Sequence, residues 1–218
     1  MRFIKDYVSK GRTMKTYLQL NTSLHGAQAQ STRLASEFVA ALARANTQPV
    51  AAAARIIVRD LAGDPLPHLT GERLTALVTP ADQRTDEQAR VAAESDTLIA
   101  ELRSADTVVI GLPMYNFGVP STLKAYFDHV ARAGVTFRYT ANGPEGLLQG
   151  KRAYVIATRG GRYAGTARDL QSAFVRQFLG FIGITDVEFI YAEGLAMGEE
   201  SRTAAIVEAG KRIEQLAA

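Results

Sequence analysis

Residues 108–134 read VVIGLPMYNFGVPSTLKAYFDHVARAG and contain a strand, a loop and a helix in succession. The run Val108–Leu112 is continuously apolar, which is typical of a parallel strand covered on both faces. Pro113 ends this strand, and Pro120 helps to set the start of the following helix. Between them lies Met114–Phe117, a mixture of residue types that neither the strand nor the helix requires.

The succession of a strand, a loop and a helix occurs several times along the chain. Five short apolar runs predict strands, and five patterns with helical spacing predict helices between and after them. The expected strands are Tyr17–Leu20, Ile56–Arg59, Val108–Leu112, Ala153–Thr158 and Val187–Ala192, and the expected helices are Ser31–Arg44, Asp86–Arg103, Ser121–Arg132, Ala167–Phe181 and Ser201–Leu216. The alternation predicts one α/β domain, a flavodoxin-like doubly wound sheet of five parallel strands in the order 2-1-3-4-5 with helices on both faces.

Two connections are longer than such a fold needs. Residues 62–86 are interrupted by prolines and glycines, which predicts irregular structure there. In residues 135–150, alternating residues lead into an Asn-Gly-Pro turn.

The composition excludes several classes of protein. With 218 residues, 47% of them hydrophobic and 22% charged, the chain suits one globular domain, and its net charge of +3 is too small to argue for nucleic acid. Cysteine is absent, so redox chemistry would need a bound cofactor. No apolar run approaches the roughly 18 residues of a membrane span, and the N-terminus lacks the apolar segment of a signal peptide. We therefore expect a cytoplasmic protein, with residues 1–13 an extension outside a domain of residues 14–218.

The loop after the first strand is a candidate phosphate site. In a doubly wound sheet, ligands bind outside the carboxyl ends of the strands, here after strands one, three and four. Residues 21–31, NTSLHGAQAQS, enter a helix whose N-terminus favours an anion, and Ser23, Gln30 and Ser31 add side-chain donors. The alternative is an inert loop with Ser31 as the helix N-cap. Neither a GxxxxGK[ST] nor a GxGxxG motif follows this strand.

The loop after the third strand has the composition of a ring-binding site. Met114, Tyr115 and Phe117 can form flat apolar walls, while Asn116 and the backbone offer hydrogen bonds. A planar heteroaromatic ligand needs that combination. The alternative is simple packing of a tight loop.

The loop after the fourth strand is Thr158-Arg159-Gly160-Gly161. Its paired glycines let the backbone approach a ligand closely and direct N–H groups towards it. Such donors can stabilise negative charge on a reduced ring. A simple turn is the alternative.

Long stretches of the sequence resemble the FMN-dependent NADH-azoreductase family, which is related to the flavodoxin-like quinone reductases. The resemblance covers residues 14–218 and is carried by NTSLHGAQAQS, MYNF, VARAGVTFRYTANGPEGL, TRGG and FLGFIGITDVEFIYAEG. It implies non-covalently bound FMN and a homodimer with its sites at the subunit interface. It also implies a ping-pong reaction in which NADH or NADPH reduces the flavin and a quinone or azo compound reoxidises it.

The resemblance also assigns roles to residues. Tyr139 and Phe181 match aromatics that cover the flavin face across the dimer, where substrate binds. Two positions depart from the commonest pattern, since Ala29 and Thr158 each stand where a serine is usual. The implied FMN contacts are Ser23, Gln30 and Ser31 at the phosphate, Met114, Tyr115, Asn116 and Phe117 along the ring, and Thr158, Arg159, Gly160 and Gly161 at the pyrimidine side.

Other readings remain open at this stage. A flavodoxin-type electron carrier would bind FMN in the same loops without oxidising NAD(P)H itself, and a binding module would hold no FMN. No catalytic residue is expected beyond the flavin, because Asp128 and His129 are adjacent on a helix and face different directions. Three scattered histidines give little support for a metal site. Neither NADH nor NADPH is favoured by the sequence.

Overall fold

The computed structural model describes residues 14–46 and 54–218, so the predicted N-terminal extension lies outside the described residues. Its centre is a five-stranded parallel sheet in the order β2-β1-β3-β6-β7. The strands are β1 (Thr16–Asn21), β2 (Arg55–Asp60), β3 (Thr107–Pro113), β6 (Arg152–Thr158) and β7 (Asp186–Ala192). Counted within this sheet alone, the order is the predicted 2-1-3-4-5, and the flavodoxin-like fold is confirmed.

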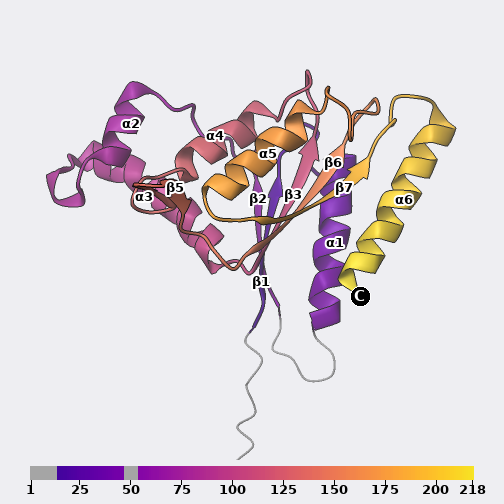
Figure 1. Cartoon of the computed structure of the whole chain (residues 1–218), viewed down its shortest axis with the longest axis horizontal. Helices are drawn as coiled ribbons and strands as arrows, with labels where there is room; N and C mark the ends of the chain where they lie inside the picture. The colour runs from indigo at the N-terminus through magenta and orange to yellow at the C-terminus, as the bar shows by residue number, and fades with distance from the viewer. Residues whose placement is uncertain (1–13, 47–53) are drawn as a thin grey trace, which may run out of the picture.

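Helices cover both faces of the sheet (Figure 1). On one face lie α1 (Gln30–Asn46) and α6 (Glu199–Ala217), and on the other α3 (Asp86–Ser104), α4 (Ser121–Val130) and α5 (Leu170–Phe181). Each face has its own apolar core. Phe38 of α1 packs edge-on against Tyr154 of β6 at 4.7 Å between ring centroids, and Phe127 stacks on Phe178 at 3.9 Å on the opposite face. Burial of these side chains on both faces explains why the strands are continuously apolar.

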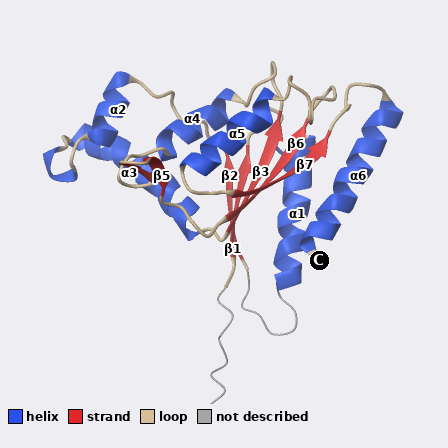
Figure 2. Ribbon diagram, viewed as in Figure 1, coloured by secondary structure: helices blue, strands red, loops and turns tan. Residues whose placement is uncertain are grey.

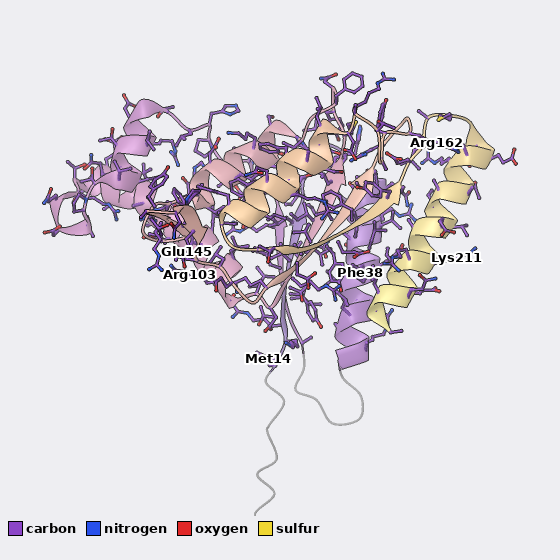
Figure 3. All side chains as sticks on the ribbon, viewed as in Figure 1. Met14, Phe38, Arg103, Glu145, Arg162 and Lys211 are labelled. Carbon is purple, nitrogen blue, oxygen red and sulfur yellow. The ribbon has the colours of Figure 1, made fainter. Side chains whose placement is uncertain are left out.

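The strand register brings the three candidate loops to one edge of the sheet. Asn21 is level with Gly111, and Pro113 is level with Thr158, so β1, β3 and β6 end together (Figure 2). Met14 lies at the opposite edge (Figure 3). Gly111 is required at this end, because a Cβ there would lie 2.9 Å from the carbonyl oxygen of Ser31. The first turn of α1 is therefore pressed directly onto the end of β3.

Two of the predicted helices are shorter than expected. Helix α4 stops at Val130 rather than Arg132, because the Thr136 hydroxyl donates to the Val130 carbonyl at 2.6 Å and accepts from the Arg132 N–H at 2.9 Å. Helix α5 begins at Leu170 rather than Ala167, after Asp169 accepts the Ser172 N–H at 3.0 Å. Both shifts come from side chains that bind backbone groups.

The two long connections contain structure of their own. Residues 62–86 hold α2 (Gly71–Val78), which was not predicted, and two 3₁₀ turns occur at Gly26–Gln28 and Ala81–Gln83. Residues 135–150 form a hairpin of β4 (Phe137–Thr140) and β5 (Gly143–Gly146), which agrees with the alternation and turn read from the sequence. None of the helices within 14–46 and 54–218 is both long and apolar enough to cross a membrane.

Candidate functional site

The first turn of α1 is prepared for an anion. The helix begins at Gln30, so Ser31 lies inside the first turn and is not the N-cap. Ala29 precedes the helix and has no side-chain oxygen that could accept the free N–H groups of the first turn of α1. The first turn also contains no carboxylate. The hydroxyl oxygens of Ser31 and Thr32 are buried and have no hydrogen-bond partner among the described residues. A phosphate fits this donor set.

Ser23 and Tyr115 join the loop after β1 to the loop after β3. Their hydroxyl oxygens lie 3.1 Å apart, and the Leu24 N–H donates to the Tyr115 hydroxyl at 3.2 Å. The Thr22 hydroxyl also donates to the Gly111 carbonyl at 2.8 Å. The predicted phosphate residue Ser23 and the predicted ring residue Tyr115 are thus neighbours in the fold.

Residues 115–118 form a tight, strained turn. The Gly118 N–H donates to the Tyr115 carbonyl at 2.9 Å, and the Tyr115 N–H donates back at 3.3 Å. Asn116 and Phe117 have positive φ angles of 49° and 65°, and they are the described non-glycine residues with that property. Bulky side chains rarely adopt this conformation, which clusters at functional sites. Phe117 is 48% exposed, and Met114 is tied to the next loop because its N–H donates to the Thr158 carbonyl at 3.1 Å.

The loop after β6 has its carbonyl groups bound on one side. The carbonyls of Arg159, Gly160 and Gly161 accept the N–H groups of residues 195, 196 and 194 at 3.1, 3.0 and 2.9 Å. Within the described chain the N–H groups of Gly160 and Gly161 have no acceptor. A Cβ on Gly161 would lie 2.7 Å from the Tyr163 hydroxyl. Two backbone donors are therefore available beside the strained turn.

The side chain of Arg159 is held by two acidic residues. Its guanidinium is fully buried, with Nη2 2.8 Å from Asp169 Oδ1 and Nη1 2.9 Å from Glu193 Oε1. Burial acts to raise the pKa of the Asp169 carboxyl, but hydrogen bonds from Arg159 and Ser172 outweigh it and hold the pKa below its ordinary value. The Arg159 N–H is engaged as well, because it donates to the Ala192 carbonyl at 2.9 Å.

A hollow of about 620 Å³ lies beside the strained turn. Asn116 and Phe117 line one side of it, and Leu170, Gln171 and Phe174 of α5 line another. These α5 residues were not predicted from the sequence, although Leu170 and Phe174 share one face of a helix and are 64% and 37% exposed. An exposed apolar pair at that spacing was the available signal.

Tyr139 and Phe181 lie apart from the three loops. Both rings contact Phe137, at centroid distances of 5.4 and 4.2 Å, and Tyr139 is 76% exposed. Phe181 ends α5, which starts beside the loops and runs back along the sheet (Figure 1). The hairpin packs against that far end of α5, where the Leu148 N–H donates to the Ile182 carbonyl at 2.9 Å. A single chain does not bring these two aromatics to the site.

Asp128 and His129 contact different partners. Asp128 Oδ1 pairs with Lys124 Nζ at 2.7 Å. His129 is buried, and its Nε2 lies 3.2 Å from Arg73 Nη2. Among the residues described, no three His, Asp or Glu side chains are grouped so that they could hold a metal ion. Arg162, which follows Gly161, reaches the start of α6, where Nη2 is 3.5 Å from Ser201 Oγ (Figure 3).

The chain is similar to known proteins over nearly its whole length. A family model described as a flavodoxin-like fold matches residues 15–217. The FMN-dependent NADH:quinone oxidoreductase 6 of Burkholderia lata is 54% identical over 200 residues, which are 92% of this chain and 98% of the relative. The FMN-dependent NADH:quinone oxidoreductase of Cellvibrio japonicus is 50% identical over 202 residues, with coverage of 93% and 98%. A crystal structure of an FMN-dependent NADH-azoreductase from Bacillus anthracis in complex with FMN matches with a TM-score of 0.82 and 27% identity, over 94% of this chain and 98% of that one.

Proposed function

The chain belongs to the flavodoxin-like family of FMN-dependent NADH:quinone oxidoreductases and azoreductases, and we propose that it transfers two electrons from NADH or NADPH to quinones and azo compounds. Residues 14–218 are assigned to one FMN-binding domain. FMN held by these loops would supply the redox chemistry of a ping-pong reaction between the nicotinamide and the acceptor.

The first turn of α1 is the observation that carries this proposal. It combines free N–H groups with two buried hydroxyls that have no partner in the described chain, and it contains no acidic residue. We assign Ser23, Gln30 and Ser31 to the FMN phosphate. Backbone donors at the helix N-terminus offset the hydroxyl that Ala29 lacks.

The other two loops would hold the ring. Met114, Tyr115 and Phe117 supply apolar contact, and Asn116 supplies hydrogen bonds at the edge. We assign the pyrimidine side to residues 158–161, with the N–H groups of Gly160 and Gly161 stabilising negative charge on the reduced ring. Arg159 would support this loop rather than donate to the ring, because its guanidinium is committed to Asp169 and Glu193 and its N–H donates to the Ala192 carbonyl.

A homodimer completes the proposed site. Tyr139 and Phe181 lie on the hairpin and at the end of α5, away from the loops of their own chain. Tyr139 is 76% exposed, which suits a residue that covers the flavin of a second copy. We propose that the two aromatics bind the quinone or azo substrate in this way, and that the enzyme works in the cytoplasm.

Anaerobic reduction separates this enzyme from an electron carrier. The purified protein, reconstituted with FMN, is expected to lose its yellow colour when NADH or NADPH is added without oxygen. A protein that is bleached by dithionite but by neither nicotinamide is a carrier. A colourless protein that cannot be reconstituted with FMN contradicts both functions.

A further inference from the structure

The side-chain amide of Gln171 joins the two ends of the strained turn. Its Nε2 donates to the carbonyls of Pro113 and Gly118, each at 2.9 Å, and its Oε1 accepts from Arg159 Nε at 3.3 Å. Gln171 is 1% exposed. Carbonyl oxygens only accept and a guanidinium only donates, so these partners fix the orientation of the amide.

Arg159 connects this amide to the loop after β6. While Nε holds Gln171, Nη1 holds Glu193, whose Oε1 accepts the N–H groups of Tyr163 and Ala164 at 2.9 and 3.0 Å. Residues 163 and 164 follow directly on the Gly160-Gly161 pair. One buried guanidinium therefore fixes the loop after β6 and, through Gln171, the turn after β3.

The strain in the turn requires such support. Non-glycine residues with positive φ persist only where the surrounding structure holds them, and Asn116 and Phe117 are consecutive. The two hydrogen bonds between Tyr115 and Gly118 close the turn but do not attach it to the domain. The Tyr115 hydroxyl contacts Ser23 and the Met114 N–H donates to Thr158. Gln171 adds an attachment of the backbone on both sides of the turn, at Pro113 and at Gly118.

We propose that Gln171, oriented by Arg159, is a positioning residue that holds residues 114–117 in the conformation that receives the flavin ring. This inference rests on the proposed function, since it assigns the turn to FMN. Gln171 is buried and binds the turn through the backbone carbonyls of Pro113 and Gly118. Its role is to keep the turn in place before the cofactor binds.

Two substitutions test this role against a matched control. Gln171→Glu places a carboxylate against two carbonyl oxygens, and Gln171→Met removes both donors without adding charge. The control is Gln177→Glu, which makes the same glutamine-to-glutamate substitution at an exposed position of α5. Hydrogen–deuterium exchange of peptides covering residues 113–118 is measured without FMN, and the FMN dissociation constant is measured by fluorescence titration.

Both Gln171 variants are expected to raise exchange in residues 113–118 and the FMN dissociation constant by about tenfold or more, while Gln177→Glu matches the wild type. Peptides of α6 should exchange as in the wild type. If Gln171→Glu does not fold, Gln171→Met decides the question.

The proposal is overturned if the Gln171 variants match the control, or if exchange rises equally in α6, which would mean a general loss of stability. A wild-type protein that does not bind FMN would contradict the proposed function instead. The exchange comparison would still test whether Gln171 holds the turn.

Discussion

Gly146 and Gly183 lie in direct backbone contact. A Cβ on Gly183 would lie 2.9 Å from the carbonyl carbon of Gly146, and Gly183 has a φ of +104°. The Leu148 N–H donates to the Ile182 carbonyl at 2.9 Å beside this contact. The hairpin that carries Tyr139 is thereby fixed to the end of α5 that carries Phe181.

Replacement of Gly146 by alanine should separate the hairpin from α5. The new Cβ would overlap the backbone at Gly183, and we expect a loss of more than about 2 kcal/mol in the free energy of unfolding. Gly180→Ala is the control, because its Cβ meets nothing within 4 Å and alanine favours the helix. Urea unfolding of both variants, with sedimentation to follow the proposed dimer, measures the effect. Equal stability of the two variants would contradict the contact.

Introducing a serine at position 29 should strengthen the phosphate site. A hydroxyl there can cap α1, which is worth about 1 kcal/mol of stability, and it adds a donor near the proposed phosphate. We expect Ala29→Ser to lower the FMN dissociation constant by about fivefold. Ala27→Ser adds the same hydroxyl at an exposed position in the 3₁₀ turn that precedes α1, and it should leave FMN binding unchanged. A similar result for both variants would remove the first turn of α1 from the phosphate site.

The strain at Phe117 can be separated from the contribution of its ring. Phe117→Gly removes the ring and relieves the positive φ, whereas Phe117→Ala removes the ring alone. Without FMN, the glycine variant should be about 1 kcal/mol more stable than the alanine variant. Both should bind FMN less tightly than the wild type, as measured by titration. An alanine variant as stable as the glycine variant would mean that the turn is not strained.

Acid should lower the free energy of unfolding by protonating the Asp169 carboxyl. The folded-state pKa of this carboxyl lies below its ordinary value of 3.8, so its stabilising contribution is complete above that pH. It is lost as the pH falls through the folded-state pKa. Urea unfolding of the FMN-free protein between pH 7 and pH 3 should therefore show a smaller acid loss for Asp169→Asn than for the wild type. Identical pH profiles would show that Asp169 does not contribute.

The sheet and its three loops could be predicted because their signals are local. Continuous apolar runs such as Val108–Leu112 mark strands buried on both faces, and strand order then places the loops at one edge. The role of Gln171 could not be predicted, since its partners at Pro113 and Gly118 are backbone carbonyls, which every residue has. The burial of the Arg159 side chain could not be predicted either, because its partner Glu193 lies 34 positions away in the sequence. Helix α2 was missed because it is only eight residues long and follows a segment rich in proline.

The central claim is that the chain itself accepts electrons from NAD(P)H and later delivers them to a separate acceptor. Its most direct test divides the reaction in two. The FMN-loaded protein is bleached with NADH or NADPH under anaerobic conditions, freed of nicotinamide by gel filtration, and then mixed with one equivalent of a quinone. We predict that the yellow flavin spectrum returns fully. A protein that stays bleached with quinones and azo compounds, or that is never bleached by either nicotinamide, would contradict the account.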